Sequence, residues 1–153
     1  MPRLELKVPP DVTWLLIAGV MWIASAVTPG LAIPMALRVG IPLMLAGAGV
    51  GIIVNARVTL DRAHTTWSPR APDLTTNLVT SGLYRFSRNP IYFGMLLVMV
   101  GWAVALASPV AVVLSAAFVL YIDRFQIRPE ERTLAALLGQ DYRDYAERVR
   151  RWV

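Results

Sequence analysis

Side chains able to bind a polar ligand gather in two short segments of the sequence, residues 80–94 and residues 124–131. Carboxylates pair with ammonium groups, whereas amides and phenols can hydrogen-bond anions and heterocycles. Taken one at a time, these residues are ordinary interfacial anchors, helix caps and helix starts. Taken together they form a candidate binding site. Its members are Tyr84, Asn89, Tyr92, Glu130 and Glu131.

Long uncharged segments flank these two clusters. Of the 153 residues, 56% are hydrophobic and 16% charged, and no charge occurs in residues 12–37, 39–56 or 91–122. A helix needs about 20 apolar residues to cross a bilayer, so the first two segments each predict one span. The third is too long for one span, and Ser108-Pro109 predicts a turn within it because proline cannot donate to the preceding helical turn.

The sequence therefore predicts one all-α membrane domain, residues 1–153, built as a polytopic transmembrane bundle with a cytoplasmic amphipathic C-terminal helix. Residues 12–56 supply two spans, residues 57–90 a loop, and residues 91–153 a helical hairpin followed by the last helix. Because a hairpin returns both of its ends to one side of the bilayer, the two clusters are expected to meet. The four expected spans are residues 12–27, 35–56, 91–107 and 110–125.

Arginine placement predicts the orientation. Apart from Arg38, every arginine and the single lysine lie before the first span, in the loop of residues 57–90, or after Asp123. Positive residues favour the cytoplasmic side, so both termini and this loop are expected in the cytoplasm. The net charge of +5 is then a feature of the membrane surface, and no nucleic-acid partner is expected.

Two further observations limit the possible classes. Arg3 and Lys7 precede an apolar run that ends in Ala24-Ser25-Ala26, which allows a secretory signal, but three more apolar segments follow and favour a transmembrane helix. The sequence has no cysteine and a single histidine, His64. Disulfides and a cysteine nucleophile are therefore excluded, and no metal is expected.

Glycine positions and the C-terminal periodicity carry two more predictions. Gly47 and Gly51 fall on one face of the second span, which predicts close packing against another helix. Apolar residues recur at steps of three and four from Leu134 to Trp152, which indicates an amphipathic helix at the membrane surface. Gly139 is expected to break that helix.

The ordered motifs around both clusters resemble the isoprenylcysteine carboxyl methyltransferase family and its phospholipid methyltransferase relatives. The resemblance covers residues 77–149, about half of the chain. The segments that carry it are Leu78-Val79-Thr80-Ser81-Gly82-Leu83-Tyr84, Arg88-Asn89-Pro90-Ile91-Tyr92-Phe93-Gly94, Glu130-Glu131 and Gly139-Gln140-Asp141-Tyr142-Arg143-Asp144-Tyr145.

The resemblance implies a methyltransferase without a Rossmann domain that holds S-adenosylmethionine at the cytoplasmic edge of a helix bundle and releases S-adenosylhomocysteine. Arg124 and Arg128, which flank Gln126, are the candidates for orienting the acceptor. The family usually has histidine at the position of Asn89 and arginine at that of Gln126. The implied cofactor-binding residues are Thr76, Asn77, Leu78, Val79, Tyr84, Asn89, Pro90, Ile91, Tyr92, Glu130 and Glu131.

The implied reaction is direct displacement at the sulfonium methyl group, without a covalent enzyme intermediate. The expected partners are the lipid bilayer and a lipophilic or lipidated acceptor that enters sideways between helices. A prenylated carboxyl group, a phospholipid amine and a small thiol remain alternative acceptors. A membrane assembly subunit without catalysis is the alternative from another class of protein.

Overall fold

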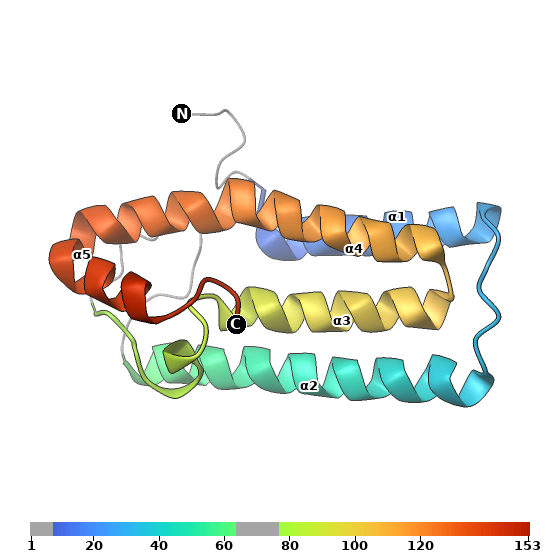
Figure 1. Ribbon diagram of the computed structural model, residues 1–153, viewed down its shortest axis with the longest axis horizontal. Helices are drawn as coiled ribbons and strands as arrows, with labels where there is room; N and C mark the ends of the chain where they lie inside the picture. The colour runs from blue at the N-terminus through green and yellow to red at the C-terminus, as the bar shows by residue number, and fades with distance from the viewer. Residues whose placement is uncertain (1–7, 64–76) are drawn as a thin grey trace.

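The computed structural model describes residues 8–63 and 77–153, and every regular element in these ranges is a helix. The main helices run antiparallel along one axis (Figure 1). The predicted all-α membrane bundle is therefore confirmed. The elements are α1 (Pro10–Val27), α2 (Met35–Arg62), the short 3-10 helix η2 (Gly82–Arg85), α3 (Pro90–Leu106), α4 (Pro109–Ile122), the π-helix η3 (Asp123–Ile127) and α5 (Arg128–Arg148).

Three of these helices are long and apolar enough to cross a membrane: α1, α2 and the continuous stretch Pro109–Arg148. The fourth apolar helix, α3, is shorter, with 17 residues. Its neighbour α4 has only 14 residues before the π-helix begins. These lengths agree with the two short spans predicted for the hairpin.

Proline marks where most of the helices begin. Pro10, Pro90 and Pro109 each occupy the first turn of a helix, and Pro34 directly precedes α2. A proline at the first helical position loses nothing, because its missing N–H would have no partner there and its φ angle already suits a helix. The same residue type that separates the spans in sequence thus starts them in the structure.

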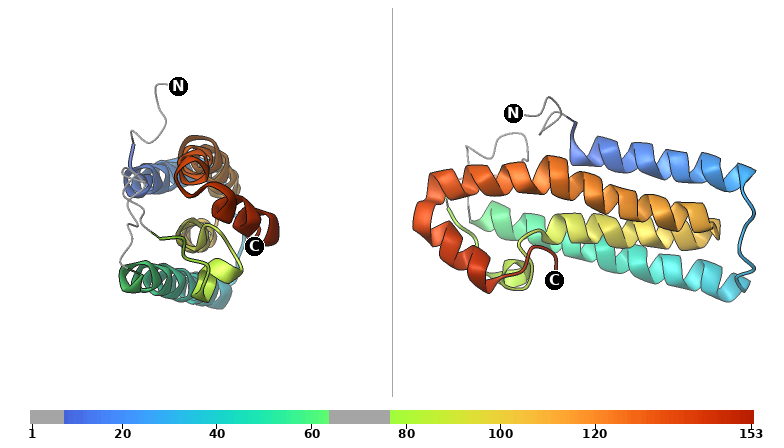
Figure 2. Two further views of the ribbon diagram at one scale, coloured as in Figure 1. Left: turned by 90° about the vertical axis from the view of Figure 1, so that its left-hand side faces the viewer. Right: turned by 45° about the horizontal axis from the view of Figure 1, so that its top comes forward.

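Helix α3 lies at the centre of the packing. It packs along α2 and also contacts α4 and α1, while α1 packs against α4. Viewed along the bundle axis, α1 and α4 form one layer, and α3 and α2 lie beneath it (Figure 2). The buried side chains between the helices include Met21, Met95, Met99, Phe118 and Ile122.

The contact between α2 and α3 depends on two glycines that face each other. A Cβ atom on Gly49 would lie 2.5 Å from the carbonyl oxygen of Gly94, and one on Gly94 would lie 2.6 Å from the carbonyl oxygen of Gly49. The predicted pair was wrong, because a Cβ on Gly47 or Gly51 would meet nothing within 4 Å. Gly47 and Gly51 do share one face of α2, as their spacing of four indicates. However, Gly49, and not either of these glycines, lies against α3.

The predicted turn of the hairpin is confirmed at residues 107–109. Ala107 ends α3 in the left-handed conformation, and the Ser108 hydroxyl accepts a hydrogen bond from the backbone N–H of Ala111. The connection between α1 and α2 is tied to the same place, since Leu31 N–H donates to the Ala107 carbonyl at 2.7 Å. Arg38 Nε donates to the Ala105 carbonyl at 2.7 Å and so supplies a positive charge at the end of α3.

Helix α4 continues through the π-helix into α5, which extends beyond the other helices before it folds back (Figure 1). The reversal occurs at Gly139, whose φ of 58° and ψ of −124° interrupt the helix. The predicted break at this glycine is confirmed. The π-helix was not predicted. It buries Gln126 and Ile127.

Candidate functional site

A cavity of about 760 Å³ is lined by residues from the start of α3 and from both parts of α5. Its wall has an apolar part, which is contributed by α1, α2 and α3. The residues of that part are Trp14, Leu15, Val50, Ile53, Met95 and Val98. Hydrogen-bonding and charged groups also line the cavity, namely Asp11, Arg57, Asn77, Tyr84, Arg88, Asn89, Tyr92, Glu130, Glu131, Tyr142 and Tyr145. The site is therefore amphipathic and is shaped by both predicted clusters.

Tyr92 and Glu130 join the two clusters directly. Tyr92 lies in the first turn of α3, is only 6% exposed, and its hydroxyl donates to Glu130 Oε1 at 2.6 Å. Desolvation raises the pKa of Glu130 to about 8; the neighbouring Glu131 adds to this rise, and the hydrogen bond from Tyr92 opposes it. Burial thus disfavours the ionised form of Glu130. A cationic ligand group beside this carboxyl group would favour the ionised form and lower its pKa.

Tyr84 is placed by the short helix η2, which Gly82 starts with a φ of 59°. The Tyr145 hydroxyl donates to the Tyr84 carbonyl at 2.7 Å, so the part of α5 beyond Gly139 is fastened to the segment before α3. Burial raises the pKa of Tyr145 to about 12 and raises that of Tyr84 as well. Both phenols therefore remain protonated hydrogen-bond donors at neutral pH.

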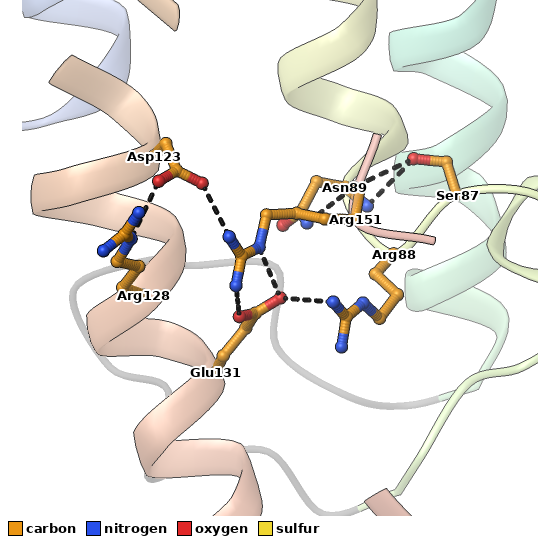
Figure 3. Close-up of polar contacts among 7 residues, drawn as sticks. All are labelled: Ser87, Arg88, Asn89, Asp123, Arg128, Glu131 and Arg151. Atoms are coloured by element: carbon orange, nitrogen blue, oxygen red, sulfur yellow. Dashed lines mark hydrogen bonds and ion pairs between the residues drawn. The ribbon is translucent and has the colours of Figure 1, made fainter. Parts of the chain in front are cut away.

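Glu131 is the centre of a charged network rather than a free carboxylate (Figure 3). Arg88 Nη2 approaches its Oε1 at 3.2 Å, and Arg151 Nη2 approaches its Oε2 at 2.6 Å. Arg151 also contacts Asp123 at 3.0 Å, and Arg128 contacts the other oxygen of Asp123 at 2.8 Å. The second glutamate of the pair is thus occupied by two arginines from distant parts of the sequence.

Asn89 precedes α3 and links it to the segment that follows α5. Its backbone N–H donates to the Ser87 hydroxyl at 3.1 Å, and its side-chain amide donates to the Arg151 carbonyl at 3.0 Å. Arg88 N–H donates to the Arg150 carbonyl at 3.0 Å. These contacts fix the residue that the resemblance places in the cofactor site.

Ten of the eleven predicted cofactor-binding residues line this one cavity, and the eleventh, Thr76, lies outside the described residues, as does His64. The ten are Asn77, Leu78, Val79, Tyr84, Asn89, Pro90, Ile91, Tyr92, Glu130 and Glu131. Their role in binding stays a prediction.

The two arginines predicted to orient the acceptor are not among the residues that line the cavity. Arg128 is paired with Asp123, and the Arg124 guanidinium lies 5.6 Å from the centre of the Phe125 ring. Gln126, where the family usually has arginine, is buried and donates to the Val8 carbonyl at 2.6 Å. Acceptor orientation by Arg124 and Arg128 stays a prediction.

Sequence reasoning did not assign several residues of the cavity wall. Arg88 directly precedes Asn89 in a quoted motif, so its position was an available signal. Tyr142 and Tyr145 belonged to the apolar stripe expected at the membrane surface, but the reversal at Gly139 turns them toward the cavity. Trp14 and Arg57 could not be assigned to the site, because the sequence does not show which residues of different helices come together in space. Among the described residues, no group of three or more His, Asp or Glu side chains could hold a metal ion.

The fold and the site define a polytopic all-α membrane protein with an amphipathic ligand cavity at one end of its bundle. The family model described as phospholipid methyltransferase matches residues 36–141, well over half of the chain. The chain belongs to the phospholipid methyltransferase family.

Individual relatives agree with this membership. An uncharacterized protein of Haemophilus influenzae is 36% identical over 63 residues, which are 41% of this chain and all of that protein. A probable protein-S-isoprenylcysteine O-methyltransferase of Oryza sativa subsp. indica is 40% identical over 75 residues, which are 47% of this chain and 38% of the plant protein. The protein-S-isoprenylcysteine O-methyltransferase of Mus musculus is 37% identical over 75 residues, 49% of this chain and 26% of the mouse protein. The resemblance inferred from the motifs is confirmed, and the matches span only part of the named methyltransferases.

Proposed function

We propose that this chain transfers a methyl group from S-adenosylmethionine to a lipophilic acceptor at the membrane border. One observation carries the proposal: the family motifs converge on a single cavity that is lined by both polar and apolar side chains. A cofactor with charged groups suits the polar side chains, and an acceptor that carries a hydrocarbon chain suits the apolar ones. Membership of a methyltransferase family supports the same assignment.

The residues present fit S-adenosylmethionine. A volume of about 760 Å³ falls within the ~300–1,000 Å³ typical of ligand pockets. Three carboxylates line the cavity, Asp11, Glu130 and Glu131, and both oxygens of Glu131 are engaged by arginines. Glu130, which is held by the Tyr92 hydroxyl, is the one we assign to an ammonium group. Tyr84, Tyr92 and Asn89 add hydrogen-bonding groups around it. This donor set matches a ligand that is cationic at one point and polar along its length.

Helices α1 and α2 supply the proposed path of the acceptor. Each packs on α3, and α1 also packs on α4, but the described residues show no comparable packing of α1 on α2. Apolar residues of both helices, including Leu15 and Val50, line the cavity and are more than half exposed. An acyl or prenyl chain could therefore pass from lipid to the cavity between these two helices.

When bound, S-adenosylmethionine supplies an electrophilic methyl group on a sulfonium centre. The task left to the protein is to align that group with the acceptor and to exclude water, and both effects lower the barrier to displacement. Tyr92 and Glu130, which line the cavity and are hydrogen-bonded to each other, would hold the polar end of the cofactor, and Trp14, Ile53 and Met95 would provide the apolar surroundings. A carboxylate or thiolate acceptor is already a nucleophile and needs no base. A phospholipid amine would have to lose a proton first.

Isothermal calorimetry with S-adenosylhomocysteine on the purified protein in detergent tests the cofactor. Wild type is expected to bind it, and Glu130→Ala or Tyr92→Ala to lose most of the affinity. No heat and no thermal stabilisation of wild type at millimolar ligand would contradict the proposal and favour an assembly subunit. Transfer of a labelled methyl group into a total lipid and small-molecule extract would then identify the acceptor as a prenylated carboxyl group, an amine lipid or a thiol.

The proposed orientation places both termini and residues 57–90 in the cytoplasm. Since the sequence has no cysteine, single-cysteine variants can be labelled without background. Gly30→Cys, at the α1 to α2 connection, should react with an impermeant maleimide from outside the cell. Glu147→Cys, near the end of α5, should react only after the membrane is permeabilised. The reverse pattern would contradict this orientation.

A further inference from the structure

We infer that Arg151, in the segment that follows α5, is a positioning residue of the ligand site. The inference rests on the proposed function, because the ligand whose binding it controls is the proposed cofactor. Arg151 does not line the cavity itself. It acts by holding residues of three separate elements that form or support the cavity wall (Figure 3).

The Arg151 guanidinium bridges α5 and the π-helix. Its Nη2 and Nε atoms contact the two oxygens of Glu131 at 2.6 and 3.1 Å, and its Nη1 atom donates to Asp123 Oδ1 at 3.0 Å. A planar guanidinium has the fixed fork of donors needed to bind one carboxylate with two nitrogens and a second carboxylate with the third. Arg151 thereby fixes the turn that carries Glu130 toward Tyr92.

The backbone of the same residue holds the start of α3. The Arg151 carbonyl accepts a hydrogen bond from the Asn89 side-chain amide at 3.0 Å. Asn89 lines the cavity and directly precedes the helix that places Tyr92. A single residue in the segment after α5, Arg151, thus connects the Asn89 side of the site with the Glu130 side.

The Arg151 side chain also balances the charges of Glu131 and Asp123, so its loss is expected to affect ligand binding as well as packing. Glu131 also faces Arg88, which lines the cavity, and the side chains of Glu131 and Arg88 are 16% and 14% exposed. Without Arg151, Glu131 and Asp123 lose their shared partner, and Arg88 becomes the main counter-charge of Glu131. A shift of Arg88 or Glu131 would change the cavity wall next to Glu130.

The segment has anchors that do not involve the Arg151 side chain, so a truncated side chain at this position is expected to leave the fold intact. Arg88 N–H donates to the Arg150 carbonyl, the Asn89 amide donates to the Arg151 carbonyl, and Trp152 packs against the buried core. Arg150→Ala is the matched control, because it removes the same charge from the neighbouring residue and keeps the backbone hydrogen bond.

The test compares the dissociation constant of S-adenosylhomocysteine and the ligand-free melting temperature in wild type, Arg151→Ala, Arg151→Lys and Arg150→Ala. We expect Arg151→Ala to weaken binding at least tenfold, Arg151→Lys to recover part of the loss, and Arg150→Ala to stay within twofold of wild type. The melting temperatures should lie within a few degrees of one another.

Two results overturn the inference in distinguishable ways. If wild type binds and Arg151→Ala binds equally well, or if its only change is a lower melting temperature, Arg151 is a structural residue and the proposed function stands. If wild type itself binds no S-adenosylhomocysteine, the proposed function fails and this inference fails with it.

Discussion

The Tyr92 hydroxyl donates a 2.6 Å hydrogen bond to Glu130 across 38 positions of sequence. This bond connects the first turn of α3 with the first turn of α5, and both residues line the cavity. It therefore brings the two clusters of the sequence into one site. It also holds the carboxylate that we expect to receive the cationic group of the cofactor.

Tyr92→Phe should weaken S-adenosylhomocysteine binding at least tenfold, because a hydrogen bond to a charged group contributes roughly 1.5–3 kcal/mol. The ring stays, so the packing of α3 should not change. Calorimetry is the measurement, with Tyr121→Phe as the control, since Tyr121 stacks on Phe125 and does not line the cavity. Equal affinity in wild type and Tyr92→Phe would show that the hydroxyl plays no part in binding.

Binding of S-adenosylhomocysteine should strengthen as the pH rises toward about 8, the value to which desolvation raises the pKa of Glu130. Below that pH the carboxyl group is protonated in the free protein, and a cationic ligand must displace the proton. The affinity should therefore rise by up to about tenfold per pH unit and level off above the pKa.

Two variants should change this pH dependence in different ways. Glu130→Gln should bind weakly with no pH dependence in this range, because the titrating group is gone. Tyr92→Phe should move the midpoint to higher pH, since the lost hydrogen bond had lowered the pKa of Glu130. A wild-type affinity that does not change between pH 6 and pH 9 would rule out ionisation of Glu130 on binding.

Gly94→Ala should destabilise the contact between α2 and α3, because the new methyl group would lie 2.6 Å from the Gly49 carbonyl oxygen. Overpacking of this kind costs about 1–3 kcal/mol. Gly47→Ala is the matched control on α2, where a Cβ atom meets nothing within 4 Å. Thermal unfolding in detergent should separate the two variants by several degrees, and equal melting temperatures would argue against the close contact.

Gly139→Ala should impair the site more than the bundle. An alanine strongly resists a φ of 58° combined with a ψ of −124°, so the reversal of α5 would be strained. Residues beyond it, including Tyr142 and Tyr145, would shift away from the cavity wall, while the contacts among α1 to α4 would remain. We expect a loss of S-adenosylhomocysteine affinity of at least tenfold with a small change in melting temperature. A variant that binds like wild type would show that this part of α5 is dispensable for the cofactor.

Val50→Trp should obstruct the apolar path between α1 and α2. Val50 lines the cavity and is 53% exposed, whereas Val54 on the same helix is 54% exposed and does not line it. We expect Val50→Trp to raise the KM for the acceptor severalfold without changing S-adenosylhomocysteine affinity, and Val54→Trp to change neither. Once the acceptor is identified, methyl-transfer kinetics provide the measurement. The same KM in both variants would place the acceptor path elsewhere.

The predictable part of this molecule depended on local physical rules. Uncharged runs and prolines located the membrane helices, and Gly139 was recognised as a break because glycine tolerates conformations that end a helix. The motifs placed ten residues around one cavity, since a hairpin has to bring its two ends together. The helices and the break follow from residue type and spacing, whereas the choice of those ten residues came from the family resemblance.

The features that escaped prediction depend on how distant segments pack. Gly49 and Gly47 are chemically alike, and only the position of α3 decides which of them needs to be glycine. Arg151 is one of several arginines near the end of the sequence, and nothing local distinguishes it from Arg150. Its role emerges only when Asp123, Glu131 and Asn89 are seen around it.

The π-helix at Asp123–Ile127 also sets the rotational phase of everything that follows it. A π-turn is in effect a single-residue insertion in an α-helix, and each residue turns an α-helix by about 100°. Deleting one residue from this turn would swing Glu130 away from Tyr92 by roughly that angle while leaving every side chain of the site present. Glu130 therefore faces the cavity because of the number of residues before it as well as because of its own identity. In this helix, a change of length upstream would act on the site as strongly as a change of residue within it.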